Sequence, residues 1–145
     1  MTTLYNNFKE LLFNGGIDLD TDTIEIALIN DSIAYTPDID NETFVSDVLD
    51  GATAAEFSDA SYSRQTLNVT VSQDNANDRA VADASDVTFS SLDGDTISGV
   101  LVYKQGSGDS DSPLIAHVTS ADFPLTANGG DVTIEIDPSG LLHLN

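Results

Sequence analysis

The aspartates near the start of the chain have the spacing that most resembles a chemical site. Segment 18–22 reads Asp-Leu-Asp-Thr-Asp and copies the opening of a calcium loop, in which alternate carboxylates converge on one hard cation. An EF-hand would continue with Gly at its sixth position and a bidentate Glu at its twelfth, where this chain has Thr23 and Ile29. The EF-hand interpretation therefore fails. A weaker site for Ca²⁺ or another cation at Asp18, Asp20 and Asp22 is the main metal site that the sequence suggests, ahead of the loop-tip pairs Asp93/Asp95 and Asp109/Asp111.

Residue types that often do catalysis occur here without the partners that catalysis needs. His117 and His143 lie inside predicted strands, with no acid or second ligand at a fixed spacing. Segment 106–108, Gly-Ser-Gly, follows a strand as a phosphate-binding turn would, but Asp109 and Asp111 come next and would repel phosphate. The chain has no cysteine, which excludes disulfides and thiolate chemistry. We therefore expect no enzyme activity and no bound organic cofactor.

The charge balance excludes whole classes of partner. The 145 residues include 25 Asp and Glu against 4 Lys and Arg, for a net charge of -21. Such a surface repels nucleic-acid phosphates and anionic lipid headgroups, so we expect no binding to nucleic acid or to membranes. The 40% of hydrophobic residues recur periodically, which indicates a folding chain rather than a disordered one. Molar salt shortens the screening length to about 3 Å and removes most self-repulsion, so the acidity indicates adaptation to brine.

Hydrophobic periodicity divides the chain into one helix and a series of short strands. Leu4, Phe8 and Leu11 share a helical face over residues 3–13, with Thr3 as the N-cap and a stop at residues 14–16. From residue 24 onward the period is two, which is typical of half-buried strands. The apolar run Val100–Tyr103 predicts the centre of the sheet. Strands are expected at residues 24–28, 66–72, 79–83, 87–89, 97–104, 114–118 and 132–136, and residues 141–144 return through the turn 137–140 as a C-terminal hairpin.

These elements predict one mainly β domain over residues 1–145. Short strands without a repeated βαβ unit favour an antiparallel β-sandwich, jelly-roll or Greek-key like, with a short N-terminal helix within residues 1–14. Residues 35–61 form a long excursion of weak periodicity, longer than a usual connection. The excursion is either functional or contains short elements near residues 44–49 and 52–57.

The N-terminal helix and the excursion supply the predicted partner interface, because a small domain would not fully bury all their large apolar side chains. Two interpretations of the helix stay open, since it either covers the core or forms an arm docked on a partner subunit. The predicted contact residues are Tyr5, Phe8 and Leu12 of the helix and Tyr35, Phe44 and Phe57 of the excursion.

A series of short sequence phrases follows one another along nearly the whole chain. They are Phe8-Lys9 with Leu12, residues 17–24 leading into Ala27-Leu28, residues 35–38, Phe44 with residues 46–48, and residues 79–80, 83–84, 86–89, 102–104, 112–116, 129–130, 132–134 and 140–142. Taken together, they resemble a family of small virion proteins of tailed bacteriophages. The resemblance implies a structural role in a virion and brings no catalytic residues. Family members more often carry Lys where this chain has Glu25, a difference in the direction of salt adaptation.

The acidity and the resemblance together predict a structural protein of a tailed virus of haloarchaea. We expect a decoration or vertex-turret component on the capsid exterior, made in the host cytoplasm, that binds copies of itself and the major capsid protein. One alternative places the protein in the tail, the baseplate or the head–tail connector. Another is a calcium- or carbohydrate-binding module in which Tyr35 or Tyr62 would stack on sugar. Three N-x-S/T sequons, at Asn30, Asn41 and Asn68, suit an exposed surface outside a cell without establishing one.

Overall fold

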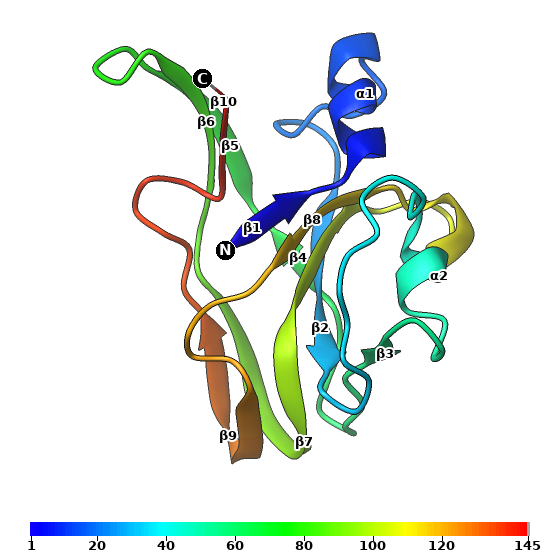
Figure 1. The fold of residues 1–145 in the computed structure, drawn as a ribbon. Helices are drawn as coiled ribbons and strands as arrows, with labels where there is room; N and C mark the ends of the chain where they lie inside the picture. Colours follow the sequence, from blue (N-terminus) through cyan, green and yellow to red (C-terminus); the bar gives the residue numbers. More distant parts are fainter. Residues whose placement is uncertain (145) are drawn as a thin grey trace.

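The computed structural model describes residues 1–144, and Figure 1 shows the arrangement of its elements. The chain opens with strand β1 (Thr2–Leu4), which pairs with β8 (Leu114–Val118), and continues into helix α1 (Asn6–Asn14). The predicted N-cap at Thr3 is wrong, because residues 2–4 belong to the sheet and Tyr5 occupies the cap position. The predicted stop is confirmed, since Gly15 takes the left-handed conformation, with φ 75°, that ends the helix.

The main sheet has the strand order β1-β8-β7-β2-β3, with β4 also paired to β2. Its other members are β2 (Ile24–Asn30), β3 (Ala55–Glu56), β4 (Gln65–Leu67) and β7 (Val87–Lys104). The run Val100–Tyr103 lies in β7 between β8 and β2, so its predicted central position is confirmed. The expectation that β2 is half-buried is wrong, because apolar side chains cover both faces of that strand.

The second layer contains β5 (Val69–Asp74), β6 (Arg79–Ala84) and β10 (Leu142–Leu144), in the order β10-β6-β5. Strand β9 (Leu125–Ile134) pairs with the first half of β7, and the two bend together (Figure 1). The pairing shifts register between Phe89 and Thr96, where Ser91 and Gly94 have positive φ angles. The strands predicted at 87–89 and 97–104 are therefore one strand that turns a corner between the layers.

Two further sequence predictions are corrected by the pairing of the second layer. The run 66–72 is two strands in different sheets, since Leu67 pairs with Ile24 and Val69 pairs with Ala84. The last strand, β10, pairs with β6 and not with residues 132–136. The turn at residues 137–140 is present, with Gly140 N–H donating to the Asp137 carbonyl at 2.7 Å, but it directs the chain toward β6. That path buries Leu142 between the layers, which is the gain that overrides a local hairpin.

The main sheet carries an apolar core on each face. One core fills the space between the two layers, and α1 contributes Phe8 to it. The other lies under residues 35–61, which include α2 (Val45–Val48) and β3 and which we call the covering segment. The excursion thus contains short elements, as one of the two sequence interpretations predicted. The short 3-10 helix η1 (Asp109–Asp111) lies beside α2.

Strands make up 45% of the chain and helices 11%, and all strand pairs are antiparallel. The prediction of a mainly β, antiparallel sandwich with a short N-terminal helix is confirmed. Strands far apart in the chain are neighbours, β1 with β8 and β2 with β7, which is the crossover pattern of Greek-key-like sandwiches. Among residues 1–144, no helix combines the length and the apolar character needed to cross a membrane.

Candidate functional site

An open cleft separates the two layers of the sandwich along the edge formed by β1. Its larger part has a volume of about 580 Å³, and its floor is formed by Ile26 of β2 and by Val100 and Val102 of β7. One wall comes from β1 and the end of β8, and the other comes from the chain between β9 and β10 with the start of β10. The residues of the first wall are Met1, Thr2, Leu4, Val118, Thr119 and Ser120, and those of the second are residues 134–137 and 139–143.

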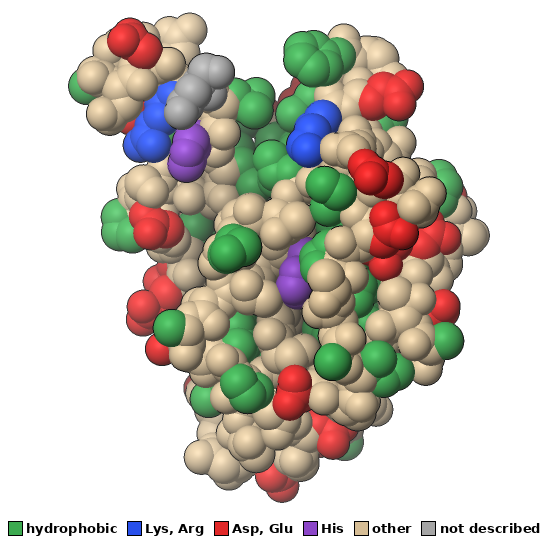
Figure 2. All heavy atoms as spheres, in the orientation of Figure 1, with side chains coloured by type: hydrophobic (Ala, Val, Ile, Leu, Met, Phe, Trp, Pro, Cys, Tyr) green, Lys and Arg blue, Asp and Glu red, His purple; other side chains and the backbone are tan. Residues whose placement is uncertain are grey.

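A second part of the open cleft lies between α1 and the three-stranded sheet. Its volume is about 340 Å³, and Leu4, Leu142 and His143 line both parts. Figure 2 shows apolar side chains gathered in the notch between the helix and the sheet. The lining residues specific to this part are Phe8, Leu12, Gly15, Ile17, Asp18 and Leu19 near the helix and Val71, Ala80, Val81, Ala82 and Leu144 from the sheet. The cleft is therefore mainly apolar from end to end, as protein-binding grooves are.

The cleft exists because of the way in which β9 and β10 divide their pairing. Strand β9 stays with β7 and β10 pairs with β6, so the residues between them cross the gap without a strand partner. Local hydrogen bonds hold this crossing, with Ile136 N–H donating to the Asp86 carboxylate at 2.8 Å and Ser139 N–H to the Asp137 carboxylate at 2.8 Å. The crossing stands off from β1, so its backbone does not close the sandwich.

Charges around the open cleft are distributed unevenly. The larger part has two acidic lining residues, Glu135 and Asp137, and no Lys or Arg among its lining residues. Beside the smaller part, Figure 2 shows basic side chains over α1 and over the three-stranded sheet, whose only cations are Lys9 and Arg79. Arg79 is paired with Asp74 at 2.8 Å, whereas Lys9 is exposed and donates to Asn6. Two of the four cations of the chain thus belong to elements that flank the smaller part of the cleft, although neither lines it.

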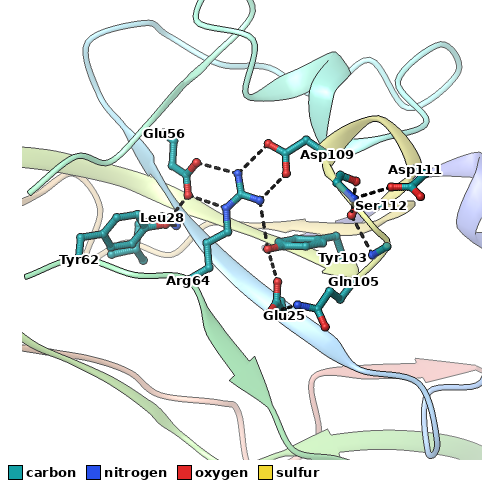
Figure 3. A network of polar contacts seen from close by, with 12 residues as sticks. Glu25, Leu28, Glu56, Tyr62, Arg64, Tyr103, Gln105, Asp109, Asp111 and Ser112 are labelled. Atoms are coloured by element: carbon teal, nitrogen blue, oxygen red, sulfur yellow. Dashed lines mark hydrogen bonds and ion pairs between the residues drawn. The ribbon is translucent and has the colours of Figure 1, made fainter.

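A second constellation, on the opposite side of the main sheet, is a clamp around Arg64 (Figure 3). The guanidinium forms bidentate ion pairs with Glu56 at 2.7 Å and with Asp109 at 2.6 and 2.9 Å. A fifth hydrogen bond reaches the Tyr103 hydroxyl at 3.3 Å, and that hydroxyl donates to Glu25 at 2.5 Å. The carboxylates of Glu56 and Asp109 raise the pKa of Arg64, and Arg64 in turn lowers the pKa of Asp109.

The Arg64 clamp is a structural device and not a free anion site. A guanidinium has five N–H donors, and here each of the five finds an acceptor. The clamp ties β3, the loop before β4, β7 and η1 together, because Glu56, Arg64, Tyr103 and Asp109 belong to those four segments. No donor is left to bind a substrate, so the arrangement fixes the covering segment in place.

A buried polar chain anchors the other end of the covering segment. The Tyr5 and Tyr35 hydroxyls are 2.5 Å apart, and Tyr35 donates to Glu42 at 2.7 Å. The ring of His117 meets Tyr35 edge-on, with centroids 5.0 Å apart. Burial raises the pKa of Glu42 and lowers the pKa of His117 to about 4. The histidine is consequently neutral near pH 7 and packs against Tyr35 as part of the core.

The structure places the predicted interface residues differently from the sequence expectation. Tyr5, Phe8 and Phe57 are at most 1% exposed, so the expectation that these aromatic rings remain partly uncovered is wrong. Their burial comes from the chain itself, because Tyr5 joins the core under the covering segment and the other two join the core between the layers. Leu12, Tyr35 and Phe44 are half-buried. Of the predicted set, Phe8 and Leu12 line the open cleft.

The burial of Tyr5 and Phe8 also bears on the two interpretations of the N-terminal helix. Both side chains pack within their own chain, which favours the helix as a cover of the core. The outward end of the helix is different, since Phe13 is 95% exposed.

The aspartates of the predicted cation site serve their own loop. The Asp18 carboxylate accepts the Asp20 N–H at 3.0 Å, and the Asp22 carboxylate accepts the Asp18 N–H at 2.8 Å. Asp22 also pairs with Lys104 at 2.9 Å. Within the described part of the chain, no group of three His, Cys, Asp or Glu side chains has the arrangement of a metal site. Cation binding at Asp18, Asp20 and Asp22 stays a prediction that the titration of a purified sample would test.

The aromatic residues considered for carbohydrate stacking are engaged in internal contacts. The Tyr62 ring is stacked on Phe89 at 5.9 Å, and its hydroxyl bridges Leu28 and Glu56. Tyr35 is held in the buried polar chain described above. Among the sequons, Asn30 is 8% exposed and donates to Asp95 at 2.7 Å, whereas Asn41 and Asn68 are exposed.

Sequence reasoning missed the residues that form most of the open cleft. They come from the first residues of the chain, from β6 and from residues 134–144, which only the tertiary fold brings together. The one available signal was the second-layer strand β5, whose exposed Val71 stands among polar residues. No protein-family model matches this chain, and no similar protein was found among curated sequences or solved structures.

Proposed function

We propose that the protein is a structural component of the virion of a haloarchaeal tailed virus, without catalytic activity. It is a decoration or vertex-turret protein on the capsid exterior that binds the major capsid protein and further copies of itself. The resemblance to small virion proteins of tailed bacteriophages supports the virion role, and the net charge of -21 supports a brine environment. A position in the tail, the baseplate or the head–tail connector is the alternative within the same class.

The observation that carries the binding role is the open cleft. The residues at the base of this space of about 580 Å³, Ile26, Val100 and Val102, are at most 1% exposed, but apolar residues of its walls, Leu4, Val118 and Ile136, are only half-buried. Apolar surface left open in this way marks a site that another chain covers, because its burial is favourable by roughly 25 cal/mol per Å². The occupant that we propose is a segment of a different virion subunit, since the acidic Glu135 and Asp137 at the cleft disfavour a second copy of this acidic chain.

The rigid, covered side of the domain suits the same role. The Arg64 clamp and the buried Tyr5–Tyr35–Glu42 chain fix residues 35–61 on the main sheet, so the domain offers one stiff face and one open face. A stiff domain loses little conformational entropy when it binds. Its other surfaces carry the acidic residues that keep a protein hydrated and soluble in brine.

Immunogold labelling of virions from the virus that encodes the chain tests the proposal. Antibody raised against the purified protein is expected to label the outside of intact heads. Labelling confined to the tail or neck would replace the capsid assignment by the alternative one. Purified virions that contain none of the protein by mass spectrometry would overturn the virion role itself. Light scattering in molar potassium chloride supplies the oligomeric state, with a trimer or pentamer expected for a capsid fitting and a hexameric ring for a tail component.

A further inference from the structure

We propose that the open cleft binds an extended polypeptide strand, which adds to β1 as a new edge strand of the main sheet. The inference rests on the proposed function, because the strand would come from another virion subunit. It goes further by naming the conformation and the charge of the occupant: extended, alternating in apolar side chains, and basic at its ends. Three independent features of the cleft support it, namely unpaired backbone, space and charge.

The backbone argument starts from the ladder between β1 and β8. Its register pairs Thr2 with Val118, Thr3 with His117 and Leu4 with Ala116. Hydrogen bonds beyond the two ends of the strand, from Tyr5 N–H to the Ile115 carbonyl at 3.2 Å and from Thr119 N–H to the Met1 carbonyl at 2.8 Å, fix which pairs are bonded. Bonded and non-bonded pairs alternate in an antiparallel ladder, so Thr3 bonds to His117, and the N–H and C=O groups of Thr2 and Leu4 point away from β8.

These outward groups are free and they face the cleft. Among residues 1–144, no hydrogen bond joins the backbone of Thr2 or Leu4 to any other segment. Both residues line the larger part of the open cleft, on the side away from β8. Unpaired donors and acceptors at a sheet edge are a template for another strand. At the opposite end of the main sheet, β3 has two residues and β4 has three, and neither strand lines the cleft.

The space in the cleft suits the side chains of such a strand. In an extended strand, alternate side chains point to the same face, so every second residue of the incoming strand would enter the cleft. The volume of about 580 Å³ lies within the range of sites that take drug-sized ligands, and its floor and inner walls are apolar. The strand would therefore cover the half-buried apolar walls beside β1, such as Leu4 and Val118, as in other complexes formed by strand addition.

The charge of the lining selects among strands. Glu135 and Asp137 line the wall that faces β1, and the one cationic group of the lining is the amino terminus of Met1, which donates to the Thr119 carbonyl. A strand with Lys or Arg at its ends would pair with these carboxylates, whereas an acidic strand would be repelled. A second copy of this chain has 25 acidic residues against 4 basic ones and is the less suitable occupant.

The test uses a synthetic peptide of seven residues, Lys-Val-Thr-Val-Thr-Val-Lys, added to the full chain in molar potassium chloride. Amide hydrogen exchange measured by NMR is expected to show slower exchange at Leu4 with peptide, by about tenfold or more at saturation, while Thr3, already bonded to β8, changes little. Two matched peptides are the controls. One carries N-methyl groups on the amides that would face β1, and the other has Glu in place of both Lys residues. Both are expected to bind at least tenfold more weakly.

Variants of the protein sharpen the same test. Thr2→Pro removes one outward N–H at the first residue of an edge strand, where proline is tolerated, and it is expected to weaken peptide binding about threefold to tenfold. Thr2→Ala removes the same side chain but keeps that N–H, so Thr2→Pro is expected to bind more weakly than Thr2→Ala, and the difference between the two variants measures the backbone donor. Thermal unfolding of both variants verifies that the fold is retained.

Several outcomes overturn the inference. The absence of slowed exchange at Leu4 at millimolar peptide excludes strand addition, and equal binding of the N-methylated peptide indicates docking through side chains alone. Slow exchange at Leu4 without peptide that appears only at high protein concentration would identify a second copy as the occupant. Each of these results leaves the virion labelling result unchanged, so the failure of the inference is distinguishable from failure of the proposed function.

Discussion

The two faces of the main sheet differ in how far the chain itself covers them. We call the face under residues 35–61 the covered side and the face with the cleft beside β1 the open side. On the covered side, residues 35–61 lie over the main sheet and bury Val45, Val48 and Ala54 completely. Every buried side-chain nitrogen and oxygen among the described residues has a hydrogen-bond partner, and the polar groups of the Arg64 clamp are fully used. On the open side, β1 retains unpaired backbone groups, and apolar wall residues of the cleft such as Leu4 and Val118 are only half-buried.

Because of this difference, stability and binding are expected to depend on different parts of the molecule. On the covered side, the buried polar groups already have hydrogen-bond partners within the chain, so the residues there are expected to matter for folding. The open side has unused hydrogen-bonding groups and uncovered apolar area, so its residues are expected to matter for assembly. Substitutions of the same type on the two sides can separate these roles.

The largest expected difference comes from removing one large apolar side chain from each side. Leu114 of β8 belongs to the core under the covering segment and is fully buried, so Leu114→Ala is expected to reduce the free energy of unfolding by about 2–5 kcal/mol. Phe13, on α1 near the cleft, is 95% exposed, and Phe13→Ala is expected to change it by less than about 0.5 kcal/mol. Urea unfolding in molar salt measures both. Equal losses would show that the two sides do not differ as the burial indicates.

The two paired arginines allow the next comparison. Arg64→Met leaves Glu56 and Asp109 facing each other without a cation, and we expect a loss of about 2–3 kcal/mol, moderated because these side chains are partly exposed. Arg79 has a single carboxylate partner, Asp74, so Arg79→Met is expected to cost about 0.5–1 kcal/mol. Denaturant unfolding of both variants measures the ratio. A loss from Arg64→Met no larger than that from Arg79→Met would mean that the clamp does not hold the covering segment.

The sequence predicted the sandwich well because its strands are short and periodic. The central position of Val100–Tyr103 followed from the unbroken apolar run, and the end of α1 followed from its glycines. The start of α1 could not be found, because residues 2–4 are recruited by β8, more than a hundred residues later. The same holds for Leu142, whose burial between the layers overrides the hairpin that the turn at 137–140 predicts.

The candidate site was predicted only in small part. Phe8 and Leu12 were identified as contact residues, and both line the cleft, but Phe8 does so as a core residue. The rest of the cleft is formed by a strand edge and by segments from both ends of the chain. Residue types alone do not reveal which strand lies at the edge of a sheet. Composition likewise could not show that Tyr5 and Tyr35 bond to each other, since their contact depends on the path of the covering segment.

A change of pH is expected to act on the covered side through His117. Burial lowers its folded-state pKa to about 4, below the ordinary value of about 6.5. Between these two values, His117 is protonated in the unfolded chain and neutral in the folded one. Stability is then lost as the pH falls through this window, by about 2 kcal/mol between about pH 7 and about pH 5.

His117→Gln isolates this effect. Glu42 acts in the opposite direction, because its raised pKa adds stability on acidification, so the comparison of the two proteins matters more than either curve. Urea unfolding at several pH values is expected to show a flatter pH dependence for the variant. Parallel curves for the two proteins would remove His117 as the cause.

The smallest expected effect tests the comparison most closely, because it uses one nearly isosteric change on both sides. Val48→Thr places a hydroxyl in the fully buried core under the covering segment, and we expect a loss of about 1–2 kcal/mol in the free energy of unfolding. Val71, on β5 at the smaller part of the cleft, is 47% exposed, so Val71→Thr is expected to change stability by less than about 0.5 kcal/mol. Threonine keeps the branched Cβ of valine, so the change alters backbone preference little in helix α2 or in strand β5. If Val71→Thr destabilised the protein as much as Val48→Thr, the cleft would be part of the folding core, and its apolar lining would need no partner to explain it.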